Sequence, residues 1–68
     1  METKYTWYGH ATHGLTVGEH KILIDPYFTG NPAASIKAEK VDADFILITH
    51  GHGDHIGDTE SIAKRTGA

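Results

Sequence analysis

Apolar and polar residues alternate along the first third of the chain, and this pattern predicts β-strands. Residues 4–8 carry aromatic side chains two positions apart, residues 12–17 form a second run, and residues 21–25 form a third. Because only a short Gly-Glu-His turn separates the second run from the third, we expect an antiparallel meander. Tyr5 and Trp7, which share one face of the first strand, are expected to lie in the core.

The second half of the chain predicts a strand that leads through a loop into a helix. Residues 44–49 are a nearly unbroken apolar run of strand length, so we expect them inside a sheet covered on both faces. Asp58 is the predicted N-cap of a helix over residues 59–66, with Gly67 as its C′ residue. Residues 35–40 predict one or two helical turns at most. Together the elements indicate an α/β (α+β) fold.

Length and composition restrict how such a fold can be stabilised. With 68 residues the chain is at the lower edge of independent folding, where disulfides, a metal or a partner usually add support. The absence of cysteine excludes disulfides and thiolate ligands, so a metal would need histidine, aspartate or glutamate. The net charge of −3 does not favour nucleic acid as a partner. No apolar run is long enough for a membrane span and no signal peptide is recognised, so we expect a cytoplasmic protein.

Residues 49–58, with the sequence THGHGDHIGD, hold the densest group of metal-binding side chains. His50 and His52 are two positions apart, so in an extended backbone both imidazoles project to one side and can share an ion. Asp54 and His55 form a second pair, and positive φ angles at the intervening glycines, Gly51 and Gly53, could turn that pair toward a neighbouring ion. Two divalent ions about 3.5–4 Å apart are the natural interpretation.

This interpretation has alternatives. A glycine- and histidine-rich stretch can be a flexible polar loop with solvated histidines, and a helical zinc-protease site would place histidines four residues apart. The glycines and the spacing oppose the helical site. Imidazole and carboxylate ligands suit zinc, manganese, iron or nickel, and nothing in the loop selects among these metals.

The combined motifs resemble the metallo-β-lactamase superfamily of metal-dependent hydrolases. Its hallmark, His-x-His-x-Asp-His, occurs here at residues 50–55. Four further segments resemble an uncharacterised branch similar to the L-ascorbate-6-phosphate lactonases: WYGHAT at 7–12, ILIDP at 22–26, FTGNP at 28–32 and IAKRTGA at 62–68. The resemblance therefore extends over nearly the whole chain.

This resemblance implies roles for individual residues. His50 and His52 would bind one divalent metal ion, while Asp54 and His55 would bind a second, with zinc the first choice and manganese, iron or nickel as alternatives. Asp54 would also be catalytic, because its carboxylate would hold the attacking water. Asp25 would support the metal loop as a hydrogen-bond acceptor behind the ligands.

Three further histidines have weaker assignments. His10 would contact substrate or orient a metal ligand, and a packed structural histidine is the alternative. His13 and His20 match no motif of the family and are expected at a strand edge and in a turn.

The resemblance also implies a fold and an activity. Residues 1–68 would be the N-terminal portion of a single αβ/βα sandwich domain, incomplete without a complementing C-terminal part in the same chain or in a second chain. A homo-oligomer is a further arrangement. The expected reaction is hydrolysis of an ester-like bond, a lactone or phosphoester, in a small-molecule substrate. The alternative is a metal-binding or assembly module without catalysis; nucleic-acid processing would require a more basic surface.

Overall fold

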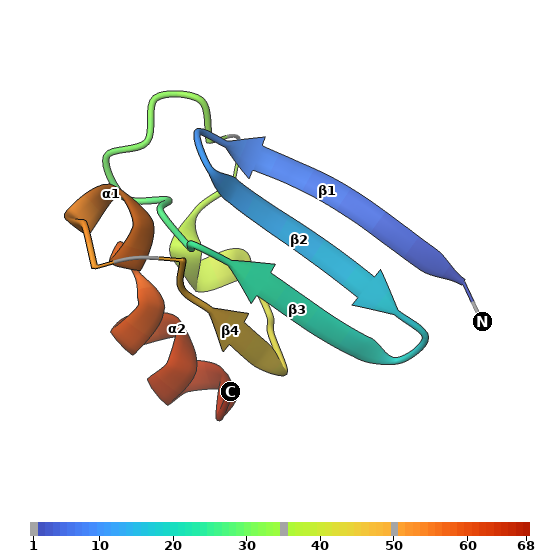
Figure 1. The fold of residues 1–68 in the computed structure, drawn as a ribbon. Helices are drawn as coiled ribbons and strands as arrows, with labels where there is room; N and C mark the ends of the chain where they lie inside the picture. Colours follow the sequence, from blue (N-terminus) through green and yellow to red (C-terminus); the bar gives the residue numbers. More distant parts are fainter. Residues whose placement is uncertain (1, 35, 50) are drawn as a thin grey trace.

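A four-stranded sheet with the order β1-β2-β3-β4 forms the framework of the chain in the computed structural model, which describes residues 2–34, 36–49 and 51–68 (Figure 1). The first three strands pair antiparallel, which confirms the predicted meander, and the fourth pairs parallel with the third. The strands are β1 (Thr3–Gly9), β2 (Thr12–Val17), β3 (His20–Ile24) and β4 (Phe45–Leu47).

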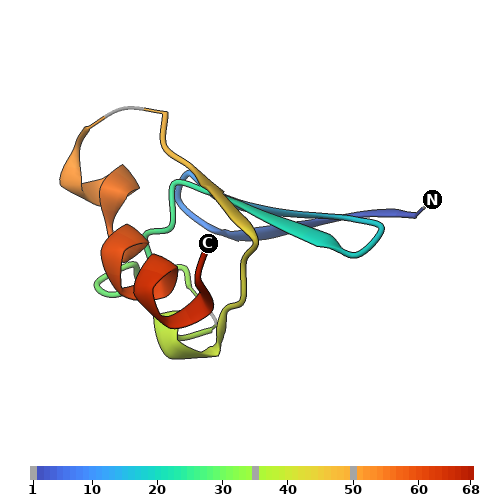
Figure 2. The ribbon, with the colours of Figure 1, turned by 90° about the horizontal axis from the view of Figure 1, so that it is seen from below.

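Helical segments and the connection between β3 and β4 cover one face of this sheet (Figure 2). They are the 3₁₀ turn η1 (Ala38–Lys40), the short helix α1 (Gly53–Ile56) and the helix α2 (Thr59–Thr66). The core lies between this layer and the sheet and consists of Leu23, Phe28, Val41, Ala43 and Ile62. Within the described part of the chain, no helix has the length and apolar character that crossing a membrane requires.

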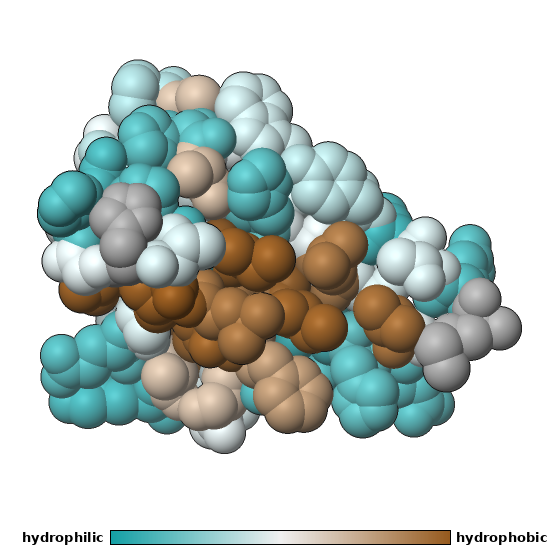
Figure 3. Space-filling model, in the orientation of Figure 1, coloured by the Kyte–Doolittle hydropathy of each residue, from teal (hydrophilic) through white to brown (hydrophobic). Residues whose placement is uncertain are grey.

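The opposite face of the sheet is apolar and open. By strand register, Tyr5 and Trp7 share this face with Phe45 and Leu47, and all four side chains are between 53% and 58% exposed. In Figure 3 the hydrophobic surface of this face, in brown, gathers over the β3 and β4 side of the sheet, whereas the surface over β1 is paler. Two predictions are therefore wrong for this chain: Tyr5 and Trp7 are not in its core, and β4 is an edge strand covered on one face only.

Helix α2 begins and ends where the sequence predicts. Asp58 is the N-cap residue and Gly67, with a left-handed φ of 79°, ends the helix by donating its N–H to Ala63. The Asp58 side chain, however, does not cap its own helix. It accepts hydrogen bonds from the backbone N–H groups of Phe28 and Thr29, both at 2.9 Å, and so ties the segment after β3 to the start of α2.

The strand directions bring three separate parts of the chain to one edge of the sheet. Strands β1, β3 and β4 run in the same direction, because each antiparallel pairing reverses the chain and β4 is parallel to β3. Their carboxyl ends therefore meet. His10 follows β1, Asp25 follows β3, and Thr49 lies just after β4.

Candidate metal centre

Asp25 is the buried anchor of this edge. Its side chain is 2% exposed, and its two carboxylate oxygens accept three hydrogen bonds. Thr49 donates its backbone N–H at 2.7 Å and its hydroxyl at 2.6 Å, and the imidazole Nδ1 of His55 lies 2.8 Å from Oδ2. The backbone of Asp25 has a positive φ of 50°. Its carbonyl oxygen accepts a hydrogen bond from the hydroxyl of Thr12 at 2.7 Å, and this contact helps to stabilise that conformation.

The charge on Asp25 follows from these contacts. Burial raises the pKa of the carboxyl group, but the hydrogen bonds from Thr49 and His55 stabilise the carboxylate more strongly and hold the pKa below its ordinary value. An ionised carboxylate can only accept hydrogen bonds, so Nδ1 of His55 carries the proton. In a neutral imidazole with its proton on Nδ1, the other ring nitrogen, Nε2, carries the lone pair with which a histidine binds a metal ion.

Two further potential metal donors lie close to that nitrogen, from His10 and Asp54. His10, Asp54 and His55 each offer one atom, and the three atoms lie within 4.8 Å of one another. Nε2 of His55 is 3.7 Å from Oδ1 of Asp54, and Nε2 of His10 is 3.4 Å from Oδ2 of the same carboxylate. Two imidazoles and a carboxylate at these distances, with one imidazole oriented from behind by a buried carboxylate, suit a divalent metal ion.

The structure brings together some of the predicted site residues. Asp54 and His55 lie in α1, close to His10 and Asp25. His52 is the N-cap of α1, where its carbonyl accepts the N–H of His55 at 3.0 Å, and it does not belong to the three-residue cluster found among the described residues. His50 lies outside the described residues.

The bend of the loop differs from the prediction. Gly53 begins α1 and does not take a positive φ. The turn after α1 is made instead by Gly57, whose φ is 44° and where a Cβ atom would come within 2.6 Å of the carbonyl oxygen of Pro26. Only glycine fits there, because both the backbone conformation and the neighbouring backbone exclude a side chain.

Two residues of this site were missed by sequence reasoning. Thr49 donates one hydrogen bond to each carboxylate oxygen of Asp25. Its position directly before the histidine-rich motif was the sequence feature that could have indicated a role in the site. Trp7 donates its indole N–H to the carbonyl of His10 at 2.9 Å. Nothing in the sequence indicates that contact, because it depends on the turn after β1.

The two histidines without a motif lie outside this cluster. His13 is in β2, where its Nδ1 is 2.7 Å from the hydroxyl of Tyr5. His20 is the first residue of β3, at the opposite end of that strand from Asp25, and its ring is 6.1 Å from that of Phe45.

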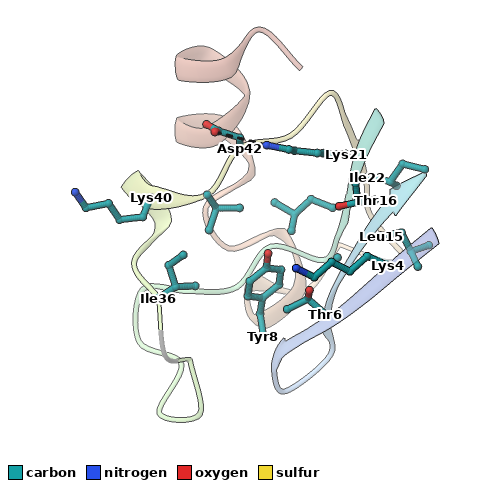
Figure 4. A pocket seen from close by; sticks show the side chains of 13 residues that line it. Lys4, Thr6, Tyr8, Leu15, Thr16, Lys21, Ile22, Ile36, Lys40 and Asp42 are labelled. Atoms are coloured by element: carbon teal, nitrogen blue, oxygen red, sulfur yellow. Dashed lines mark ion pairs between the residues drawn. The ribbon is translucent and has the colours of Figure 1, made fainter. Parts of the chain in front are cut away.

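A separate hollow of about 210 Å³ lies on the helix-covered face (Figure 4). Lys4, Tyr8, Lys21 and Asp42 are among its lining residues, and the ammonium of Lys21 is 4.0 Å from the carboxylate of Asp42. Among the described residues that line the hollow, Asp42 is the only acidic one and none is a histidine. The hollow therefore lacks the donor set of a metal centre, and the cluster at the sheet edge is the stronger candidate site.

Comparison with known proteins shows which family this chain belongs to. The sequence matches the family described as the β-lactamase superfamily domain over residues 4–66. A protein of Thermococcus onnurineus named UPF0173 metal-dependent hydrolase is 62% identical over 65 residues, which are 96% of this chain and 29% of the relative. A protein of Heliobacterium modesticaldum with the same name is 60% identical over 63 residues, 93% of this chain and 26% of the relative. The chain thus spans less than a third of the length of these relatives.

A solved structure has the same fold. It is described as the structure of Igni18, a novel metallo hydrolase from the hyperthermophilic archaeon Ignicoccus hospitalis, and it superposes with a TM-score of 0.87 at 38% sequence identity. The match covers 97% of this chain and 30% of that structure, and it supports the predicted fold class. With the family match over residues 4–66, it follows that this chain belongs to the β-lactamase superfamily, among relatives named metal-dependent hydrolases.

Proposed function

We propose that this chain forms part of a metal-dependent hydrolase whose metal centre lies at the carboxyl edge of β1, β3 and β4. In this proposal His50 and His52 bind one divalent ion, and Asp54 and His55 bind a second. The observation that carries it is the buried carboxylate of Asp25, 2.8 Å from Nδ1 of His55. That contact fixes the ring so that its other nitrogen is presented to the donors around Asp54.

The chain's own residues have distinct tasks in the proposed reaction. A divalent ion in such a site supplies Lewis acidity and makes water a competent nucleophile near neutral pH. Asp54, whose side chain is 47% exposed, is the catalytic residue: its carboxylate accepts a hydrogen bond from the attacking water and holds it in line with the scissile bond. Asp25 and Thr49 keep His55 in one orientation, so the donor set does not have to rearrange during turnover.

The proposed ions and substrate follow from the donors and the family. Nitrogen and oxygen donors without thiolate suit zinc first, with manganese, iron or nickel as alternatives. The proposed substrate is a small molecule with an ester-like bond, a lactone or a phosphoester. This choice rests on the likeness to lactonases of the superfamily, since the described residues form the metal-binding edge rather than a closed substrate pocket.

We further propose that the open apolar face of the sheet is covered by the C-terminal part of the same fold. Large apolar side chains that are half exposed on one continuous sheet face usually mark a surface that another element covers. Within the described part of the chain, the cluster offers three donor atoms, one fewer than a tetrahedral ion requires, and the covering segment is proposed to supply further ligands at the sheet edge.

The function is tested by measuring metal content and hydrolysis together, in the protein at its natural length. We expect bound divalent metal, and hydrolysis of a lactone or phosphodiester panel that chelation abolishes and added metal restores. The double variant His50→Ala/His52→Ala should lose one metal equivalent and the activity. His20→Gln, which removes a histidine at the far end of β3, is the matched control and should retain both.

Two results would contradict this proposal. Wild-type metal stoichiometry and affinity in the His50→Ala/His52→Ala variant would remove the loop from the metal centre. Metal binding without hydrolysis of any member of the panel would favour the alternative, a metal-binding or assembly module.

A further inference from the structure

We propose that His10 is itself a metal ligand, contributed by the turn after β1 and held in place by Trp7. The inference rests on the proposed function in one respect, namely that the loop containing Asp54 and His55 binds a metal ion. It goes beyond that function because it adds a donor from a strand distant in sequence from the metal-binding motif. It also assigns Trp7 as a positioning residue.

The first argument is the distance between the donor atoms. Nε2 of His10 lies 3.4 Å from Oδ2 of Asp54. That separation is longer than a charge-assisted N–H···O hydrogen bond, which is about 2.7–2.9 Å. Two ligands that each lie about 2.1 Å from one tetrahedral ion are themselves roughly 3.4 Å apart. The pair therefore has the spacing of two ligands around a shared ion.

The second argument is the direction from which His10 approaches. Its ring lies edge-to-face with that of His55, with centroids 5.5 Å apart and an interplanar angle of 73°, so the two imidazoles converge without stacking. The ring of His10 also forms a T-shaped pair with that of Tyr27, with centroids 5.6 Å apart and an interplanar angle of 83°. The imidazole, whose side chain is 43% exposed, thus contacts a second potential ligand and an aromatic side chain.

The third argument is the backbone of the turn after β1. The strand register shifts between Trp7 and Gly9, and both Gly9 and His10 have positive φ angles, 107° and 56°. A positive φ is uncommon for a residue other than glycine, and such strained residues concentrate at functional sites. Here the indole N–H of Trp7 donates to the carbonyl of His10 at 2.9 Å, which stabilises the turn that aims the imidazole at Asp54.

The test uses cobalt(II) in place of the native metal, in the protein at its natural length. In the wild type, proton NMR should show a paramagnetically shifted, exchangeable imidazole N–H signal for every metal-bound histidine. His10→Asn should lose one of these signals and bind cobalt at least tenfold more weakly. Asparagine is the chosen replacement because it tolerates the left-handed backbone at this position.

The positioning role of Trp7 predicts a different result. Trp7→Phe keeps an aromatic ring but removes the indole donor, so all the shifted signals should remain while cobalt affinity falls by a smaller factor than in His10→Asn. An affinity equal to that of the wild type would overturn the role of Trp7. His20→Gln is the control histidine substitution and should change neither the signals nor the affinity.

A measurement on the wild type keeps the proposal falsifiable if His10→Asn does not fold. Zinc titration of protein with ¹⁵N-labelled histidine should move the Nε2 resonance of His10 to the position of a metal-bound nitrogen. A His10 resonance that stays unchanged while that of His55 shifts would overturn ligation by His10 and leave the proposed function intact. No shift at His55 either would overturn both. A histidine that only contacts substrate would show no shift, because substrate is absent.

Discussion

Replacement of Asp25 by asparagine is the most informative single change, because it retains the shape of the side chain and removes only its charge. The amide has one accepting oxygen, so its NH₂ group must face some of the donors that now reach the carboxylate. If the oxygen keeps the N–H of Thr49, the NH₂ group faces Nδ1 of His55. The imidazole must then accept at Nδ1, and its proton moves to Nε2.

Two effects of this change can be estimated separately. Three hydrogen bonds reach the carboxylate, and replacing a charged partner by a neutral one weakens each by about 1 kcal/mol. The metal-free protein should therefore lose about 3 kcal/mol of unfolding free energy. A proton on Nε2 blocks the nitrogen that faces Asp54, so metal affinity should fall roughly 10–100-fold, which corresponds to about 1.4–2.7 kcal/mol.

The matched control is Asp58→Asn. The Asp58 carboxylate also accepts three hydrogen bonds, from Phe28 and twice from Thr29, but it has no contact with the donor cluster among the described residues. Urea unfolding of the metal-free proteins should give similar losses for the two variants. Competition with a chelator should give weaker metal binding for Asp25→Asn only. Equal metal affinity in the two variants would refute the proposed role of Asp25 in setting the tautomer of His55.

Three further changes test the fold. Burial raises the pKa of Asp58, but hydrogen bonds from Thr29 and Phe28 lower it more, to below its ordinary value of 3.8. The carboxylate therefore stabilises the protein above about pH 5, and this contribution is lost as the pH falls through its pKa. In urea unfolding, the stability difference between wild type and Asp58→Asn should shrink between pH 5 and pH 3. Gly57→Ala should lower the free energy of unfolding by at least ~2 kcal/mol, because the φ of 44° and the nearby backbone exclude a Cβ atom. Gly53→Ala, in open space within α1, should be neutral or raise the free energy of unfolding by up to ~1 kcal/mol. Equal effects of the two substitutions would contradict this assignment of the bend. Arg65→Lys should lose ~1–2 kcal/mol, because the guanidinium donates to two backbone carbonyls around η1; unchanged stability would show that these bonds contribute nothing.

Local patterns predicted the elements whose formation depends on neighbouring residues. Strand β2 (Thr12–Val17) and helix α2 (Thr59–Thr66) have the predicted bounds, because alternation, an N-cap residue and a C′ glycine are signals within a few positions of each element. The same patterns could not say what covers each apolar face. Phe45 is part of an apolar run, yet it is 53% exposed, since burial depends on segments that pack from elsewhere.

Side-chain partners distant in the sequence were likewise beyond prediction. Asp58 was expected to cap its own helix, which is the usual role of an aspartate at that position. Its carboxylate instead binds Phe28 and Thr29, thirty and twenty-nine residues away, because the segment after β3 passes the start of α2. Sequence spacing contains no information on such a crossing.

The candidate site combines both kinds of information. The motif at residues 50–55 identified Asp54 and His55 as candidate ligands, because potential metal donors stand close together in that short stretch. His10 and Asp25 enter through strand direction: β1 and β3 point the same way as β4, so residues that follow these strands meet the loop at one edge. Both residues also have positive φ angles, and the presence of a histidine or an aspartate in a sequence does not predict that backbone conformation. The proposed metal centre thus depends on backbone conformations at His10 and Asp25 that only the assembled sheet can hold in place. Variants that relax these two turns should therefore weaken metal binding, even though they leave every residue of the motif unchanged.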